Sequence, residues 1–580
     1  MSRPARSRDR SGPVRVAPPR GSKGAAAGAA PAATHSRGGP IAVALFAAVL
    51  ISGALLRAQV VRSIPQFFGP GDPAIYFGMA RGVLHHGVAR VNFLHHFLAL
   101  PKSISHIEDY YEPAYAYLPA LAMAIGGERH ATALWSSFVL GVACIVLVWG
   151  LARRDGPWTA LIAAAIVTFE PWSIYYSGVL MKEAAVSVIV LAYLWFLRRG
   201  VTLERPPWQA GVATGLATVC AGLFQYELIP ILGITSIVVL AIHRPRALIG
   251  YFASSGLALL MLAGVMWHAS GVLISAKYAF VLGRVPGDPD QLPGGSAGER
   301  TLWPFSYLGR SVLELWYPTL LLLGALGTSS PRLDRIERTL LLTYLGTHLY
   351  LHAIPQDLWS RDFIVLTAVL ARPAALAVSA PREWWLARGR APAVWTLLFF
   401  LWAAGAVARL LVPPGASLGF WVYVGLYTAL SIPAGAVAWG LTRSRLRSAW
   451  ARLTPVVVAL GLTADFAVSM PYPQILLNPE FPTYETERAR RERVCHWMAS
   501  TVPRGPVLAQ IPEEVEWYSG FPSVVMPEVF HPGAVRRLVA RYHIRYLLDQ
   551  PGSIPDSVVA SLPLRKVGEK EDWGLYEFTP

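Results

Sequence analysis

Charged residues and cysteines are scarce in this sequence. Asp, Glu, Lys and Arg make up 15% of its 580 residues, whereas an ordinary soluble domain carries about 25%. Hydrophobic residues make up 54%, and a single soluble core rarely grows beyond about 250–300 residues. A soluble single-domain protein is therefore excluded, and most of the chain belongs in lipid. The three cysteines, Cys144, Cys220 and Cys495, are far apart in the sequence and indicate a fold without disulfide bonds.

Nucleotide-binding and redox motifs are absent as well. The sequence has no Walker A motif, no GxGxxG, no CxxC and no internal repeat, so we expect no reaction driven by nucleotide hydrolysis. The net charge of +16 does not indicate nucleic-acid binding, because much of it lies in residues 1–40. That segment has eight basic residues, one acid and many Ala, Gly, Pro and Ser residues, so we predict a disordered cytoplasmic tail. A cleaved signal peptide fits less well, because the apolar run begins only near Pro40.

Apolar segments recur between residues 41 and 470. At about 20 residues each, they predict about thirteen transmembrane helices. Every second connection is rich in arginine: Arg153-Arg154, then residues 198–205, 244–246, 332–338, 382–390 and 443–452. By the positive-inside rule these connections and the N-terminus are cytoplasmic, and the tail after Met470 is outside. We therefore predict a multi-pass protein of the inner or plasma membrane with an extracytoplasmic C-terminus.

Two regions on the predicted outer side are large. The first loop, residues 61–130, contains amphipathic stretches of the kind that lie along a membrane interface. The tail, residues 471–580, has helical patterns at 486–501 and 532–542 and strand-like runs at 507–511, 544–548 and 574–578. The predicted organisation is a tail (1–40), a helical membrane module (41–470) and a small extracytoplasmic α/β domain (471–580).

Acidic residues stand at the predicted membrane boundary. Asp72 follows the first apolar segment and suits either a catalytic base or the N-cap of a helix beginning at Pro73. Glu112 suits acceptor orientation, metal coordination or capping of the helix that follows. Tyr226-Glu227 lies between two spans, where an ionisable group normally faces the bundle interior. The first-loop histidines match no standard zinc spacing and are interpreted as interfacial: His85, His86, His95, His96 and His106.

Short motifs follow one another in a fixed order between residues 41 and 379: Leu56-Arg57, Asp72 with Tyr76 and Ala80, Tyr111-Glu112-Pro113-Ala114-Tyr115, Glu170-Pro171 and Lys182-Glu183. This order resembles the GT-C superfamily of polyprenyl-phosphate-sugar-dependent glycosyltransferases, in particular the protein O-mannosyltransferase and lipid A aminoarabinose transferase-like enzymes. The sequence departs from the common pattern where Pro73 replaces a second acid and where Gln225-Tyr226 stands in place of an Arg-containing turn. Because of these two departures, the resemblance does not identify the donor sugar.

The resemblance implies that a sugar moves from polyprenyl phosphate to a hydroxyl group of a lipid, polysaccharide or protein acceptor, by an inverting displacement. Asp72 is then the base. The donor phosphate ligands are Lys182, Arg361 and Arg57, and the acceptor or cavity residues are Glu112, Tyr115, Glu183, Tyr226 and Glu227. The alternative for the three cations is that they snorkel to the interface, or that Arg361 pairs with Asp357 or Asp362. The first loop has no DxD motif and a monophosphate leaving group demands no divalent ion, so we expect no cofactor, although a divalent metal stays possible.

Other function classes fit less well. A lipid or polysaccharide transporter or flippase would show inverted repeats and broken helices, and neither is visible. An O-antigen ligase or polymerase would carry its main catalytic loop late in the chain, whereas here it is the first loop. A receptor with an outer binding domain remains an alternative, but an enzyme explains why acidic and basic residues gather on the outer loops.

Overall fold

The computed structural model describes much of the helical module and most of the C-terminal domain. The described residues are 39–63, 72–95, 101–108, 111–204, 206–270, 318–353, 364–379, 481–527, 532–550, 554 and 556–579. The predicted basic tail, the segment that contains Arg361 and most of the later predicted spans lie outside these ranges.

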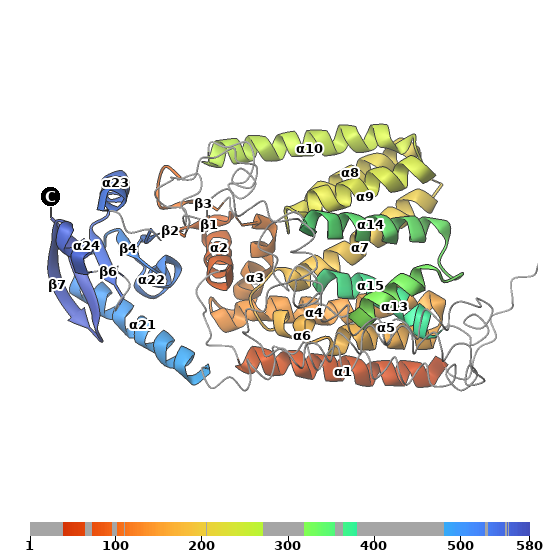
Figure 1. Ribbon diagram of the computed structural model, residues 1–580, viewed down its shortest axis with the longest axis horizontal. Coiled ribbons are helices and arrows are strands. Elements are labelled where there is room, and N and C mark those ends of the chain that lie inside the picture. Colours follow the sequence, from red (N-terminus) through yellow and green to blue (C-terminus); the bar gives the residue numbers. More distant parts are fainter. Residues whose placement is uncertain are drawn as a thin grey trace, which may run out of the picture.

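The helices run mainly along the long axis of the molecule, and the sheet domain lies at one end of them (Figure 1). Four of the described helices are long and apolar enough to cross a membrane: α1 (Gly39–Ser63), α4 (His130–Ala152), α7 (Glu183–Thr202) and α10 (Ala247–Ser270). Shorter apolar helices are α3 (Pro113–Gly126), α5 (Pro157–Phe169), α9 (Leu228–His243) and α15 (Ile364–Val378). The multi-pass membrane class is confirmed, and the number of thirteen spans stays a prediction.

Three further helices belong to the described bundle: α8 (Pro207–Gly222), α13 (Pro318–Thr328) and α14 (Arg335–Ala353). Small residues allow close packing in this bundle. A side chain at Gly211 on α8 would overlap the main chain of Ala247 on α10, and one at Gly250 would overlap the main chain of Trp208. Such small-residue contacts are typical of helix pairs in membranes, where backbones approach closely.

The first loop forms helix α2 (Asp72–His86), three two-residue strands and α3. The strands are β1 (Arg90–Val91), β2 (Phe93–Leu94) and β3 (His106–Ile107), of which β1 and β3 pair antiparallel. Pro113 lies in the first turn of α3. Backbone N–H groups in this turn have no partner within the helix, so the missing N–H of proline costs no helical hydrogen bond. Helix α2 packs on α3, with Tyr76 edge-on to Tyr115 at 4.9 Å between ring centroids.

The C-terminal domain contains α21 (Phe481–Thr501), β4 (Val507–Ala509), α22 (Pro512–Ser519), β5 (Ser523–Val525), α23 (Pro532–Tyr542), β6 (Tyr546–Asp549), α24 (Asp556–Ser561), β7 (Leu564–Lys570) and β8 (Trp573–Phe578). The predicted helices correspond to α21 and α23, and the predicted strands to β4, β6 and β8. Helices α22 and α24 and strands β5 and β7 were not predicted from the sequence. The apolar runs at β4 and β6 form strands in the interior of the domain: all three residues of β4 and the first three of β6 are buried.

One strand of this sheet comes from the first loop. The described sheet has the order β2-β5-β4-β6-β8-β7. The first four strands in this order pair in parallel, and β8 pairs antiparallel with both of its neighbours, β6 and β7. Phe93 of β2 pairs with Ser523 of β5, more than four hundred residues along the chain. Leu94 is fully buried in the same apolar cluster as Leu508 and Val524. The first loop and the C-terminal domain therefore share one sheet and one core.

Candidate functional site

Asp72 lies at the start of α2 and is only partly exposed. The hydroxyl of Tyr111 donates a hydrogen bond of 2.6 Å to its Oδ1 atom. Each carboxylate oxygen can accept more than one hydrogen bond, so this contact fixes the carboxylate without using up its capacity as an acceptor. The arrangement is chemically suited to receive a proton from a neighbouring hydroxyl group.

Glu112 and Lys182 form a buried ion pair beside Asp72. The Lys182 Nζ atom donates to Glu112 Oε1 at 2.7 Å, and the side chains are 11% and 1% exposed. The second oxygen of Glu112 accepts a hydrogen bond of 3.1 Å from the Tyr76 hydroxyl. Glu112 is the N-cap residue of α3, but its side chain makes no capping hydrogen bond to that helix. A lysine ammonium has three donors, and the bond to Glu112 occupies one.

Tyr76 bonds to Glu112, and its ring packs against Tyr111, the tyrosine that bonds to Asp72. Burial, followed by the negative charges of Glu112, Asp72 and Glu183, raises the pKa of Tyr76 well above its usual value. The phenol therefore stays protonated and acts as a hydrogen-bond donor. Its ring also stands edge-on to Tyr111, with 5.5 Å between centroids.

The predicted cavity residues lie around this cluster. Tyr115 is fully buried, and its hydroxyl bonds to Ser137 Oγ of α4 at 2.7 Å. The main-chain N–H of Tyr226 donates to Glu112 Oε1 at 3.4 Å. Glu183 is buried in the first turn of α7, and Glu227 precedes α9. The structure thus brings Asp72, Glu112, Tyr115, Lys182 and Tyr226 together, with Glu183 near enough to act on the pKa of Tyr76.

Arg57 is fully buried between α1, α5 and α6 (Pro171–Tyr176). Its guanidinium donates to the main-chain carbonyls of Gly53, Val167 and Thr168 at 3.1–3.2 Å, and to two serine hydroxyls. The last carbonyls of a helix lack partners within the helix, and Arg57 supplies donors to those of α5. This environment indicates a structural role, and donor binding by Arg57 stays a prediction.

Two of the first-loop histidines, His95 and His106, lie beside Glu108, whereas His85 pairs with Glu128. The Nδ1 atom of His95 lies 3.6 Å from Glu108 Oε2, and the Nε2 atom of His106 lies 3.8 Å from the same oxygen. Among the described residues, no group of three or more His, Cys, Asp or Glu side chains could hold a metal ion. Metal independence stays a prediction.

Helix α2 also connects this cluster to the C-terminal domain. Phe77 stands edge-on to Trp517 of α22, with 4.5 Å between centroids. Arg81 lies over the same indole ring at 4.8 Å and pairs with Glu516 at 3.1 Å. Asp72 and these two contact residues share one helix, so the position of α22 is linked to that of the candidate base.

Tyr76 and Tyr111 are members of the cluster that the sequence pattern did not predict as site residues. Tyr76 is four residues after Asp72, which places both on one face of α2, and this spacing was an available signal. Tyr111 is adjacent to Glu112, and only the fold shows that its hydroxyl reaches Asp72.

Known proteins resemble the chain in family pattern and in fold. Residues 112–270 match the family model described as dolichyl-phosphate-mannose-protein mannosyltransferase. That segment contains Glu112, Tyr115, Lys182, Glu183, Tyr226 and Glu227. Among curated protein sequences, none matches the chain.

The chain was also compared with three solved structures. ArnT from Cupriavidus metallidurans bound to undecaprenyl phosphate gives a TM-score of 0.53 at 13% identity, over 94% of this chain and 100% of that chain. The apo form of the same protein gives 0.51 at 15% identity, over 93% and 99%. The apo oligosaccharyltransferase of Archaeoglobus fulgidus gives 0.48 at 14% identity, over 87% and 69%. The two ArnT structures show the fold, and together with the family model they confirm the resemblance drawn from the sequence.

Proposed function

We propose that this chain, a membrane glycosyltransferase with the GT-C fold, transfers a sugar from a polyprenyl-phosphate donor to a hydroxyl acceptor on the outer face of the membrane. The family model over residues 112–270 supports the transferase class. ArnT, which has a similar fold, is bound to undecaprenyl phosphate in one of its structures, and this supports a polyprenyl-phosphate donor for the present chain. The shape of the pocket determines which sugar is transferred and which acceptor receives it.

Asp72 is the base in this proposal. The observation that carries it is the 2.6 Å hydrogen bond from Tyr111 to Asp72, beside the Tyr76–Glu112–Lys182 cluster. An acceptor hydroxyl loses its proton as its oxygen attacks the anomeric carbon, and a positioned carboxylate receives that proton. The bond between the anomeric carbon and the phosphate oxygen breaks on the opposite face, which inverts the configuration.

The leaving group is a phosphate anion, so it requires cations rather than a strong acid. Lys182 suits this role because it is largely buried, lies at the same end of α7 as the Asp72 cluster and has donors beyond the one bonded to Glu112. Arg361 is the second proposed ligand and lies outside the described residues.

The C-terminal domain has an acceptor-side role in this proposal. It shares a sheet with the first loop and contacts α2 through Trp517, so it is placed to shield the cavity or to recognise the acceptor. We propose the domain organisation 1–40, 41–470 and 471–580, with a cytoplasmic N-terminus and an extracytoplasmic C-terminus.

A transfer assay tests the function. Membranes containing the full chain are incubated with radiolabelled polyprenyl-phosphate sugars, and transfer to any acceptor is compared between wild type and Asp72→Asn. Asp572→Asn is the matched control, because Asp572 is 81% exposed in the turn between β7 and β8. Transfer by wild type and Asp572→Asn but not by Asp72→Asn supports the proposal. Equal transfer by all three proteins excludes Asp72 as the base, and no transfer with any donor rejects the proposed donor class.

A further inference from the structure

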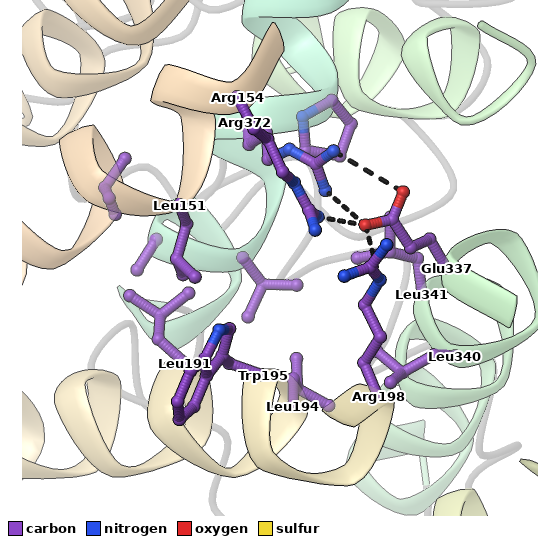
Figure 2. Close-up of a pocket in the computed structure, with 14 residues that line it drawn as sticks. Leu151, Arg154, Leu191, Leu194, Trp195, Arg198, Glu337, Leu340, Leu341 and Arg372 are labelled. Atoms are coloured by element: carbon purple, nitrogen blue, oxygen red, sulfur yellow. Dashed lines mark hydrogen bonds and ion pairs between the residues drawn. The ribbon is translucent and has the colours of Figure 1, made fainter. Parts of the chain in front are cut away.

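A cavity of about 70 Å³ lies between α4, α7, α14 and α15. Its wall is mostly apolar and includes Leu151, Leu194 and Trp195. At one side, three guanidinium groups surround the carboxylate of Glu337, as Figure 2 shows. The site is separate from the cluster around Asp72.

The three arginines share a single carboxylate. Arg198 Nε lies 2.9 Å from Glu337 Oε1, Arg372 Nη1 lies 3.3 Å from the same oxygen, and Arg154 also bonds to it. Arg372 pairs in addition with Asp155 at 2.6 Å. Three like charges held around one carboxylate favour the approach of a further anion.

The surrounding segments also carry an excess of positive charge. Residues 153–155, 198–199, 332–338 and 372 contain eight arginines and three acids, which leaves a net charge of +5 from these residues. The acids Asp155, Asp334 and Glu337 already pair with arginines. Further compensation of this charge therefore has to come from outside these segments.

Two of the three guanidinium groups, those of Arg154 and Arg198, can be reached from outside the cavity. The side chains of Arg154 and Arg198 are 35% and 30% exposed, whereas Glu337 is 6% exposed. Trp195, in the apolar wall, is 43% exposed. An apolar wall beside accessible arginines is complementary to a ligand with an anionic head and a hydrocarbon tail.

The cavity lies at the end of the bundle opposite to the Lys182–Glu112 pair. Glu183 and Arg198 are fifteen residues apart on the same helix, α7, which corresponds to about 22 Å at 1.5 Å per residue. The cavity also lies where the arginine-rich connections meet, and the positive-inside rule assigns that side to the cytoplasm. Basic pockets between transmembrane helices on that side are suited to anionic lipid head groups.

We infer that this cavity binds an anionic phospholipid of the cytoplasmic leaflet. Arg154 and Arg198 hold the phosphate, because guanidinium groups form charge-assisted hydrogen bonds with phosphate oxygens. An acyl chain lies along Leu151, Leu194 and Trp195. The site is independent of the proposed sugar transfer, so its test does not require activity.

Native mass spectrometry and thermal unfolding of the delipidated full-length protein test the inference. The probes are phosphatidylglycerol, phosphatidylcholine and glycerol 3-phosphate. The variants are Arg154→Gln and, as the matched control, its neighbour Arg153→Gln, which is exposed and does not line the cavity. Ala368→Leu leaves every charge in place and fills part of the cavity, so it tests the tail pocket even where Arg154→Gln fails to fold.

Phosphatidylglycerol should be retained by wild type and Arg153→Gln, and should raise their unfolding temperature. Arg154→Gln should bind it at least about fivefold more weakly, and Ala368→Leu should also weaken retention. Phosphatidylcholine and glycerol 3-phosphate should have little effect. Equal binding by wild type, Arg154→Gln and Ala368→Leu overturns the inference, as does equal binding of the two phospholipids. Binding of glycerol 3-phosphate as strong as that of phosphatidylglycerol would assign the site to a free phosphate instead.

Discussion

Lys182 and Glu112 form an ion pair of 2.7 Å although they are seventy residues apart in the sequence. The pair joins the start of α3 to the start of α7, and both side chains are largely removed from solvent. A buried charge without its partner is strongly unfavourable, typically by about 3–5 kcal/mol. The pair therefore fixes the geometry of the site as well as its charge.

Lys182→Gln and Glu112→Gln should each destabilise the protein, because each leaves the opposite charge buried without an ionic partner. The double variant should lose less stability than the sum of the two single losses, with a coupling free energy of about 1–3 kcal/mol. Thermal unfolding of the purified chain measures this coupling. Lys182→Gln should also weaken donor binding, whereas additive single losses would show that the two charges do not stabilise one another.

The C-terminal domain should support turnover without supplying the base. Trp517→Ala removes the ring that contacts Phe77 and Arg81, so amide hydrogen exchange should become faster in α2 and α22. Sugar transfer should fall by about tenfold or less, since the base stays in place. Trp497→Ala is the control, because Trp497 packs within the C-terminal domain against β7. Complete loss of transfer by a folded Trp517→Ala protein would indicate a direct catalytic role for this domain.

The local patterns of the sequence predicted much of the C-terminal domain but not its connection to the first loop. Helix α23 has the predicted bounds because its apolar residues recur at helical spacing. Strand β2 has only two residues, too few for any periodic pattern, so its pairing with β5 was invisible. Asp72 and Lys182 were found from their place beside apolar segments. Their contacts with Tyr111 and Glu112 depend on three-dimensional packing that local periodicity does not encode.

Stability should depend on pH through Glu514. Burial raises its pKa to about 7, although Arg491 at 2.6 Å acts in the opposite direction. The folded state then keeps a proton that the unfolded chain releases above its pKa of about 4.3. This contribution to stability is fully present below about pH 4 and is lost as the pH rises to about 7, by up to about 3 kcal/mol.

Unfolding measurements at pH 5 and pH 8 check this dependence. Glu514→Gln should become more stable relative to wild type as the pH rises, and it should retain sugar transfer because this residue is not the base. Glu487→Gln is a control on the half-exposed side of α21. A stability difference between Glu514→Gln and wild type that is the same at both pH values would exclude a raised pKa.

The predicted topology can be tested with single cysteines in a Cys220→Ser background, since Cys220 is exposed whereas Cys144 and Cys495 are buried. A cysteine at Thr202, after the arginine-rich end of α7, should be protected from an impermeant reagent in intact cells. A cysteine at Ser561 in the C-terminal domain should be modified. Both positions are exposed, so protection at Thr202 reflects the membrane. The reverse labelling pattern would place the Asp72 cluster on the cytoplasmic side.

Asp72→Asn gives the sharpest test of the mechanism. Asparagine keeps the size of the side chain and can still accept the hydrogen bond from Tyr111, but it does not take up a proton. Loss of a general base typically lowers the rate by about 10²–10⁴, whereas loss of a helix cap costs about 1 kcal/mol of stability. Tyr111→Phe keeps the carboxylate and removes only the hydroxyl that positions it, so its rate should fall much less.

Initial rates of sugar transfer and thermal unfolding are measured for Asp72→Asn, Tyr111→Phe and wild type. A large loss of rate with near-normal stability for Asp72→Asn, and a smaller loss for Tyr111→Phe, identifies the carboxylate as the proton acceptor. Near-normal turnover by a folded Asp72→Asn protein would reject this role. Glu112 is then the next candidate, because it is the other carboxylate bonded to this cluster, through Tyr76 at 3.1 Å. In that case Glu112→Gln, and not Asp72→Asn, would abolish transfer.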